Sequence, residues 1–590
     1  MLKINNSHRE IRARIYILIT LCTLAIICLF IGYAHLTLNQ NKRYHELAIN
    51  NFQKNKQTRP IRGTIFDRNH RPLADNKIVY HAYLRVTDDI SQQTIARIED
   101  LITIDEQSLS ILSSGEPIKS KILLKKDLSQ NELAALGIHQ HDIPGLIIEE
   151  ELIRTYPYGH YLSHVVGTSQ TLEKNVSNHS DSKDFYFSVL KGMTGIEKTF
   201  DTHLAGIGGW EHITKTATGE IQSKVDIISP SQGKNIKITI DAELQKAIYE
   251  LAKDYNGSII VTDVESGEIL AALSLPSFDP NQLMFTHKKS GNQFFNRITH
   301  GLYPPASTVK PLIALEALNQ KIITEDTEID DPGFYETPNK AHRYNDWQKH
   351  GHGIVNIQKA IAVSCDTFFY HIAQKMGPYN LFHSMQNFGL GQATGVELPN
   401  EKRGLIPTPN WKSMKKQRWF LGDSIITGIG QGATSVTPLQ LAQATLLLAK
   451  RGNAKQIHLT KALSDDTAWT EFQARDYPPI EYKTKHWDLI ARALEDVIKF
   501  GTGHRFHNNP YRAAGKTGTA QVVNISNQND KNLKSQDHSL FIGYAPSNSP
   551  KVSIVVILEH NPYAAKLASD IISLYFENFI DDVQKTVDNS

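Results

Sequence analysis

The chain has 590 residues, enough for several domains, and its 40% hydrophobic and 21% charged residues are typical of globular protein and exclude a largely disordered chain. Its 63 basic and 61 acidic side chains give a net charge of +2, which argues against a dedicated nucleic-acid-binding protein. Of its three cysteines only Cys365 lies outside the apolar N-terminal stretch, so a disulfide-rich secreted scaffold is excluded as well.

The N-terminal region predicts one membrane-spanning helix. Residues 15–34 carry no charge, and about 20 such residues are needed to cross a bilayer core. Basic residues precede this stretch, so the positive-inside rule places residues 1–14 in the cytoplasm and residues 15–35 in the membrane as an anchor. A cleaved signal peptide is the alternative. We favour an uncleaved anchor with a large exported body, because the apolar run is long and no A-x-A-like site follows Gly32.

The next region predicts an elongated α+β domain over residues 36–230. Residues 36–58 are polar and charged and suggest a helical stalk. From Arg59 onward, short apolar runs alternate with turn residues, which is the pattern of an extended α+β structure.

A change of pattern near Pro230 predicts a second domain over residues 231–590. Residues 236–240 alternate like a strand, and Asp241 is placed to cap an amphipathic helix. Strands near both ends with helices between them predict an α/β body on an antiparallel sheet. A hairpin, a helix, a strand and a final helix are expected at residues 258–264 with 269–274, 439–448, 551–558 and 564–579.

The sharpest chemical signal lies in residues 303–311, where Ser307 and Lys310 are three positions apart. Pro311 lacks an N–H and is tolerated only in the first turn of a helix, so a helix is predicted to begin near Ser307. Residues three apart share a helix face, so Lys310 can reach the Ser307 hydroxyl. A serine needs a base to act as a nucleophile, and a lysine amine can serve when its pKa is lowered by burial or by another cation.

A Ser-x-x-Lys pair is common on helix surfaces and recurs in this chain, so its meaning depends on the motifs that follow it. Ser364 and Asp366 form a Ser-x-Asp motif, and Lys516 opens a Lys-Thr-Gly-Thr motif further on. Ser364 can pass a proton between the lysines and a leaving amine, and Asp366 can orient the lysines. Lys516 places a cation beside Lys310, which would favour the neutral amine of Lys310.

The residues after Lys516 are suited to hold a substrate. Gly518 allows a substrate backbone to approach a strand closely. Thr517 and Thr519 offer hydroxyls to a substrate carboxylate, and the Thr519 N–H could complete an oxyanion hole.

This ordered triple of motifs resembles the serine acyl-transferases that react with penicillin, and the rest of the chain resembles their class B penicillin-binding branch. The segments that carry the class B resemblance are residues 62–68, 195–197, 204–206, 428–432 and 538–546. Within class B the chain is most similar to the elongation branch, through residues 156–159, 331–333, 346–347 and 351–353.

The resemblance implies a penicillin-binding transpeptidase fold over residues 231–590, an α/β (α+β) body whose antiparallel sheet is sandwiched by helices. An elongated α+β pedestal of the dimerisation type, residues 36–230, and one N-terminal transmembrane helix would precede it. The implied activity is a peptidoglycan D,D-transpeptidase that cross-links stem peptides during cell-wall elongation, with D,D-carboxypeptidase activity as a side reaction. Ser307 would attack the penultimate D-Ala of a stem peptide, and an amine of a neighbouring stem would resolve the acyl-enzyme. β-Lactams would acylate the same serine.

The resemblance also implies a location and partners. The protein would sit in the bacterial inner membrane with its N-terminus in the cytoplasm and its catalytic domain in the periplasm. A polytopic glycosyltransferase would touch the membrane helix and pedestal, and other elongation-complex proteins would bind the pedestal. No nucleic acid and no organic cofactor are expected.

Four potential metal ligands, Asp331, Asp346, His352 and Cys365, fall close together in the sequence. One thiolate, one imidazole and two carboxylates make a plausible tetrahedral zinc set, similar to a zinc site of some elongation-type members. The zinc would be structural and would clamp the loop containing three of these residues against the Ser364 motif. The alternative is a buried free cysteine that acts as a small apolar residue. Neighbouring candidate ligands are Asp330, His350 and, less favoured, His342.

Two other functions remain open at this point. A β-lactamase shares the three motifs, but it is normally a small soluble domain without an anchor or pedestal. A non-catalytic penicillin-binding scaffold or sensor is the other reading, although a scaffold would not need the full motif set.

Overall fold

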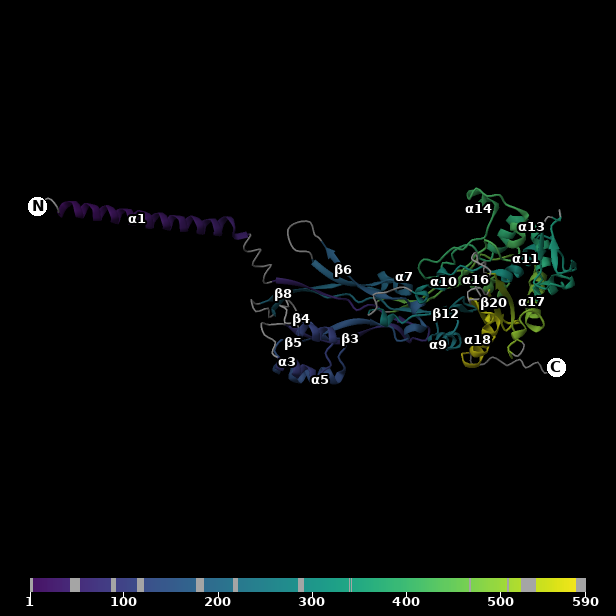
Figure 1. Cartoon of the computed structure of the whole chain (residues 1–590), viewed down its shortest axis with the longest axis horizontal. Coiled ribbons are helices and arrows are strands. Elements are labelled where there is room, and N and C mark those ends of the chain that lie inside the picture. The colour runs from purple at the N-terminus through teal and green to yellow at the C-terminus, as the bar shows by residue number, and fades with distance from the viewer. Residues whose placement is uncertain are drawn as a thin grey trace. The chain divides into compact units, whose positions relative to one another are not determined.

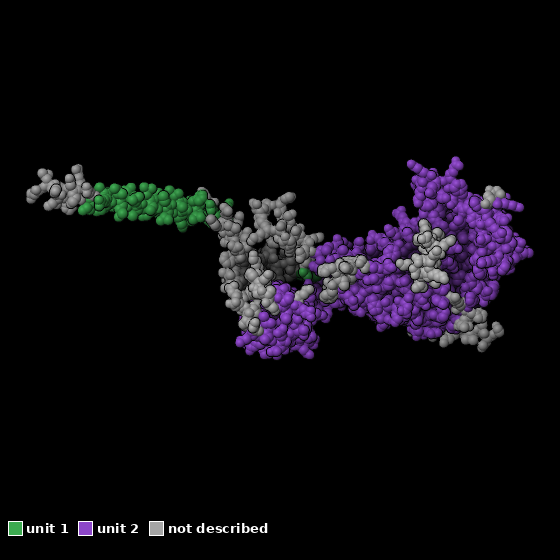
Figure 2. Space-filling view, viewed as in Figure 1, with its two compact units in different colours: residues 1–60, 206–232 green, residues 61–205, 233–590 purple. Residues whose placement is uncertain are grey.

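The structure is a computed structural model of the whole chain, and it forms two compact units. Unit 1 contains residues 1–60 and 206–232, and unit 2 contains residues 61–205 and 233–590 (Figure 2). The residues that the structure describes are 4–42, 53–85, 92–113, 121–176, 185–215, 221–284, 291–338, 340, 342–465, 468–506, 509–521 and 537–579.

Unit 1 contains the apolar helix and a small sheet. Helix α1 (Ile4–Ala34) leads into the π-helical turn η1 (His35–Asn39), and Ile11–Leu38 is long and apolar enough to cross a membrane (Figure 1). This agrees with the predicted single anchor. Strands β1 (Gln53–Thr58), β8 (Gly209–Lys215) and β9 (Ile221–Ile228) form an antiparallel sheet in the order β1-β8-β9.

The predicted helical stalk is wrong at its C-terminal end, because residues 53–58 form strand β1. The pairing runs from Gln53 opposite Thr214 to Thr58 opposite Gly209. A polar stretch adopts this extended form when a distant strand supplies hydrogen-bonding partners, and local composition does not reveal such a partner. Residues 43–52 of the predicted stalk lie outside the described residues.

The N-terminal part of unit 2 is built on a mixed sheet. Its strands follow the order β18-β17-β10-β2-β3-β4, and β5 pairs with β3. Those strands are β18 (Trp469–Glu471), β17 (Thr460–Ser464), β10 (Ile236–Ile238), β2 (Ile65–Phe66), β3 (Pro72–Arg85), β4 (Lys121–Lys125) and β5 (Leu146–Thr155). The other elements are α3 (Gln92–Glu99), α4 (Glu106–Ser113), α5 (Gln130–His139), η2 (Gln140–Asp142), η3 (Gly159–Tyr161), α6 (Ser163–Val166), the β6 (Ser169–Val176) and β7 (Phe185–Gly192) hairpin, α7 (Gly195–Thr199) and α8 (Asp201–Leu204).

A buried group of charges joins two of the motifs singled out in this part of the chain. Glu197 accepts from Arg62 Nε at 2.7 Å and from Arg154 Nε at 2.8 Å, and all three side chains are buried. Arg62 also pairs with Asp201 at 2.8 Å. Because a buried carboxylate needs such partners, these ion pairs fix residues 62–68 against the 195–197 segment.

The C-terminal body is built on a five-stranded antiparallel sheet in the order β12-β11-β21-β20-β19. The strands are β11 (Gly257–Asp263), β12 (Ile269–Leu275), β19 (Ala514–Ala520), β20 (His538–Ala545) and β21 (Val552–Leu558). Helix α16 (Pro438–Ala449) packs on one face, and α9 (Ala242–Ala252) and α18 (Ala564–Asn578) cover the other (Figure 1). The predicted sheet between helices is therefore confirmed, as are the hairpin, the Asp241 cap and the final helix.

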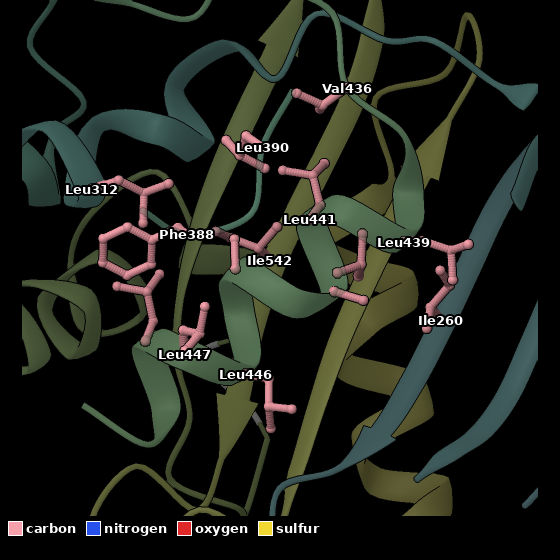
Figure 3. Packing of buried hydrophobic residues seen from close by; sticks show 14 of the residues in the cluster. Ile260, Leu312, Phe388, Leu390, Val436, Leu439, Leu441, Leu446, Leu447 and Ile542 are labelled. Carbon is pink, nitrogen blue, oxygen red and sulfur yellow. The ribbon is translucent and has the colours of Figure 1, made fainter. Parts of the chain in front are cut away.

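The sequence of the sheet strands explains why both faces are covered. Successive side chains of a strand point to opposite faces. Ile260 belongs to the core cluster that contains α16, whereas Ile259 and Val261 belong to the cluster that contains α9 and α18. Figure 3 shows leucines of α16 between Ile260 on one side and Phe388 on the other, with Ile542 among them. A continuously apolar strand therefore contributes side chains to the hydrophobic cores on both faces of the sheet.

The rest of the body is a mostly helical lobe beside the sheet. Its longer helices are α11 (Lys310–Asn319), α13 (Asp366–Gln386) and α17 (Thr484–Lys499). Two small two-stranded sheets pair β13 (Ile329–Asp331) with β16 (Gly353–Val355) and β14 (Phe334–Glu336) with β15 (Arg343–Asn345). Shorter helices are η4 (Pro280–Met284), η5 (Asn292–Phe294), α10 (Arg297–His300), η6 (Ala306–Val309), α12 (Ile357–Ala362), α14 (Pro409–Met414), α15 (Leu421–Thr427) and η7 (His504–Phe506).

Candidate active site and adjacent ligand cluster

Ser307 lies in a tight turn at the start of a buried helix. The 3₁₀ helix η6 carries Ser307, and α11 begins at Lys310 with Pro311 in its first turn, as the prolines predicted. Ala306 has a φ of +49°, which is unusual for a residue with a side chain. Its N–H donates to the carbonyl of Gly430 at 2.8 Å, so a neighbouring segment holds this strained turn in place.

Lys310 brings the first and second motifs together. Its fully buried Nζ donates to the Ser364 carbonyl at 2.8 Å and to Ser364 Oγ at 3.3 Å, and it makes an ion pair with Asp366 Oδ1 at 2.7 Å. Ser364 has a φ of +59°, so its backbone is also held in the left-handed region. The Lys310 side-chain nitrogen thus contacts three oxygens of the Ser-x-Asp motif.

Lys516 lies in β19, and its side chain is fully buried. Burial lowers the pKa of Lys516 well below its usual value, the charge of Lys310 lowers it further, and Asp366 acts in the opposite direction. The sequence analysis placed the cation on Lys516 and the neutral amine on Lys310. The lowered pKa of Lys516 argues against the cation on Lys516, and the carboxylate of Asp366 contacts Lys310 rather than Lys516.

Strand β19 lies at the edge of the sheet and beside the nucleophile turn. A Cβ atom at Gly518 would lie 3.0 Å from Thr308 Cγ2 and 3.3 Å from the Pro305 carbonyl, so glycine permits this close approach. Because β19 is an edge strand among the described strands, its outer side can pair with an extended peptide. The third motif therefore lies directly beside the turn that carries Ser307.

Two residues that the sequence analysis did not assign hold β19 in place. Thr502 Oγ1 is hydrogen-bonded to Thr517 Oγ1 at 2.5 Å, and Gln431 Nε2 donates to the Thr519 carbonyl at 2.8 Å. Gln431 lies in the 428–432 segment, which was recognised as a landmark without a role. No pattern in the sequence points to Thr502.

The four predicted metal ligands form one cluster. The candidate ligand atoms of Asp331, Asp346, His352 and Cys365 all lie within 4.8 Å of one another. His352 Nδ1 is 2.7 Å from Asp331 Oδ2 and 3.7 Å from an oxygen of Asp346, and Cys365 Sγ donates to Asp331 Oδ2 at 3.4 Å. The alternative ligands Asp330, His350 and His342 are not members of this cluster.

Burial, hydrogen bonds and the charges of neighbouring carboxylates set the electrostatics of the cluster. Burial acts to raise the pKa of Asp331, but hydrogen bonds, including those from His352 and the Gly333 N–H, lower it overall. Burial and then the charge of Asp346 raise the pKa of the Cys365 thiol. A divalent cation would reverse this balance, because it favours the thiolate and the carboxylates together.

The donor set fits a four-coordinate zinc ion. It offers one sulfur, one imidazole nitrogen and two carboxylate oxygens, the ligand types of structural zinc sites. His352 Nε2 is buried without a hydrogen-bond partner among the described residues, so His352 is not fully satisfied by the protein alone. Cys365 caps α13 and lies between Ser364 and Asp366, so the cluster is attached directly to the second catalytic motif.

Comparisons with known proteins cover both parts of the chain. Residues 57–238 match the penicillin-binding protein dimerisation domain, and residues 257–574 match the penicillin-binding protein transpeptidase domain. The chain is 34% identical over 593 residues to the peptidoglycan D,D-transpeptidase MrdA of Acinetobacter baumannii, covering 96% of this chain and 88% of that protein. It is 33% identical over 530 residues to MrdA of Escherichia coli K12, covering 85% and 83%.

Solved structures show the same likeness. Penicillin-binding protein 2 of Helicobacter pylori, in complex with MreC, has a TM-score of 0.70 and 27% identity, covering 90% of this chain and 99% of that one. Penicillin-binding protein 2 of Pseudomonas aeruginosa, in complex with WCK 5153, has a TM-score of 0.66 and 28% identity, covering 90% and 98%.

Proposed function

Since this chain belongs to the class B penicillin-binding proteins of the penicillin-binding protein 2 type, which are peptidoglycan D,D-transpeptidases of cell elongation, we propose that Ser307 is its nucleophile and Lys310 its base. One observation carries this assignment. Lys310 lies one helical turn after Ser307, and its buried amine contacts both Ser364 and Asp366 of the second motif.

Acylation moves one proton and exchanges one bond. Ser307 Oγ attacks the carbonyl carbon of the penultimate D-Ala while its proton passes to the Lys310 amine. Asp366 then stabilises the ammonium that forms on Lys310, in the way that a buried carboxylate stabilises a protonated base. Ser364 passes that proton to the nitrogen of the terminal D-Ala, which leaves as a free amine while Ser307 keeps the acyl group as an ester.

The second half-reaction reverses these roles. An amine of a neighbouring stem peptide attacks the ester carbonyl, and its proton returns through Lys310 to Ser307 Oγ. A new amide cross-link forms and the serine is released. Water in place of the amine gives the carboxypeptidase side reaction, and a β-lactam amide in place of the stem gives a long-lived ester on Ser307.

Strand β19 supplies the substrate side of this site. We assign the Thr517 and Thr519 hydroxyls to the terminal carboxylate of the donor stem, and the Thr519 N–H to the oxyanion hole. The absence of a side chain at Gly518 keeps the strand close to the nucleophile turn. Lys516, whose pKa is lowered by burial, contributes an amine beside Lys310 without adding a second full charge.

A cross-linking assay tests this function. The full-length protein in detergent is given uncross-linked peptidoglycan strands with pentapeptide stems, and released D-Ala and cross-linked muropeptides are measured. We expect both products from the wild type and neither from Ser307→Ala. Ser231→Ala, which alters the exposed serine of another Ser-x-x-Lys pair, is the matched control and should retain both. A wild type that binds strands but releases no D-Ala would support a scaffold instead, and hydrolysis of penicillin would support a β-lactamase.

We propose a structural zinc ion at Asp331, Asp346, His352 and Cys365. When bound, the ion supplies positive charge that holds a thiolate beside two carboxylates. These residues would then join the loop from β13 to β16 to the turn that carries Ser364. Metal analysis of purified protein should find about one zinc per chain. Cys365→Ser should lower both zinc content and melting temperature, whereas Cys22→Ser in α1 should lower neither. Metal-free wild type with an unchanged melting temperature in Cys365→Ser would refute the site.

The cellular setting is proposed from the anchor and the relatives. We place α1 in the bacterial inner membrane, residues 1–14 in the cytoplasm and the catalytic domain in the periplasm. We propose a polytopic glycosyltransferase as a partner of the helix and pedestal, and elongation-complex proteins as partners of the pedestal. The complex of the H. pylori relative with MreC supports this choice. Full cellular function with an unrelated transmembrane helix would contradict the helix contact.

A further inference from the structure

Helix α14 and the segment that joins it to α15 expose an unusual combination of side chains. We call it the rim surface. Met414 is 80% exposed and Phe420 is 64% exposed, although both are large and apolar. Basic side chains lie between them in the sequence and are also exposed. Figure 1 shows α14 at the outer border of unit 2, where side chains project in Figure 2. The rim surface consists of Trp411, Met414, Lys415, Lys416, Arg418 and Phe420.

Within the part of the chain that the structure describes, the positive charge of the rim surface is not neutralised. The nearby carboxylate of Asp423 already forms an ion pair with Lys412, with Nζ and Oδ2 2.6 Å apart. No described carboxylate lies within ion-pair distance of Lys415, Lys416 or Arg418. Lys415 Nζ instead lies 4.2 Å from the centre of the Trp411 ring. Uncompensated cations beside exposed aromatic and apolar groups indicate a surface that binds an anionic partner with apolar faces.

The rim surface is held in a defined conformation. The Phe420 N–H donates to Asp423 Oδ2 at 2.8 Å, and Trp419 Nε1 donates to Ser424 Oγ at 3.0 Å. The Trp411 N–H donates to Thr408 Oγ1, which caps α14. A preorganised surface loses less entropy when it binds a partner.

The rim surface is close along the chain to residues that contact the turn carrying Ser307. Helix α15 begins right after Phe420 and is about 10 Å long at 1.5 Å per residue. It leads into Gly430, whose carbonyl accepts from the Ala306 N–H, and into Gln431, which holds the Thr519 carbonyl. One end of this short segment therefore supports the catalytic turn, and the other end carries the exposed cations.

We propose that the rim surface binds the peptidoglycan strand itself, outside the groove that holds the donor stem. This rests on the proposed function. The strand presents the apolar faces of its sugar rings and the free carboxylates of its stem peptides. The aromatic and apolar side chains match the sugars, and Lys415, Lys416 and Arg418 match the carboxylates.

Strand binding can be measured separately from catalysis. The full-length protein carries Ser307→Ala so that strands are bound but not consumed, and it is co-sedimented with uncross-linked strands over a range of salt concentrations. We expect Lys415→Gln/Lys416→Gln/Arg418→Gln to weaken binding about tenfold at low salt and to flatten its salt dependence, since three exposed ion pairs are lost. Met414→Ser/Phe420→Ser should weaken binding without changing the salt dependence.

The control removes the same charge elsewhere. Lys246→Gln/Lys253→Gln/Lys566→Gln neutralises three exposed lysines on the α9 and α18 side of the sheet and should bind strands like the parent. Equal binding by both triple variants would overturn the proposal. The proposal would also be overturned if the rim variants lost binding to phosphatidylglycerol vesicles but bound strands like the parent, because the occupant would then be a lipid surface. Acylation of wild-type protein by benzylpenicillin is measured in parallel, and its failure would overturn the proposed function rather than the rim surface alone.

Discussion

Replacing Gly430 with alanine should slow acylation far more than it destabilises the protein. Gly430 has a φ of +67°, and a Cβ atom there would lie 2.4 Å from the Ala306 carbonyl oxygen. Ordinary contact begins at 3.4 Å, so the turn before Ser307 must move by about 1 Å. A misplacement of about 1 Å in a catalytic group can cost about 100-fold in rate.

Gly432→Ala is the control for the conformational cost of placing alanine at a positive φ. Its φ is +71°, so alanine there carries the same conformational penalty of about 1–2 kcal/mol. Its Cβ would meet only Ile426, with Cγ2 at 2.9 Å, and not the nucleophile turn. The assay is the second-order rate of acylation by a fluorescent penicillin, with melting temperature measured beside it. Similar melting temperatures and an acylation rate about 100-fold lower in Gly430→Ala are expected. Rates within threefold of each other would refute the claim that Gly430 positions Ser307.

Two further predictions concern buried charges. Lys516→Met should raise the melting temperature at pH 7, because burial lowers the pKa of Lys516 and the unfolded chain therefore holds a proton that the folded protein releases. The destabilisation caused by Lys516 decreases as the pH rises from its lowered pKa to the ordinary lysine value of about 10.4. The increase in melting temperature of Lys516→Met over the wild type should therefore shrink across that pH range. An increase that stays constant would contradict this explanation. Glu197→Gln should destabilise unit 2 by about 3–5 kcal/mol in a urea titration, because Arg62 and Arg154 lose their shared buried carboxylate. Protein that remains folded should acylate normally. A decrease of less than about 1 kcal/mol in the free energy of unfolding would show that these buried ion pairs stabilise the protein no more than an exposed ion pair does.

The sequence predicted those features of the fold that depend on local pattern. Apolar strands with a glycine-containing turn predicted the β11–β12 hairpin, and Asp241 predicted a helix start, because each signal involves neighbouring residues. The helical stalk failed at residues 53–58 because their strand partner lies about 150 residues away in β8. Long-range pairing of polar strands has no local signal.

The same distinction applies to the candidate site. Motif order brought forward Ser307, Lys310, Ser364 and the four members of the ligand cluster; the structure places Lys310 against Ser364 and the four ligand atoms within one cluster. The left-handed backbone of Ala306 and the lowered pKa of Lys516 could not be predicted, because both depend on contacts between segments distant in sequence. Thr502 was missed for the same reason, since its hydrogen bond to Thr517 exists only once α17 and β19 are side by side.

The central claim is that Ser307 forms the acyl-enzyme, and the mass of the intact protein after exposure to benzylpenicillin tests it most directly. The wild type should gain the mass of one penicillin and keep it for hours, while Ser307→Ala should gain none. An adduct that persists in Ser307→Ala, or none on folded wild type, would contradict the assignment.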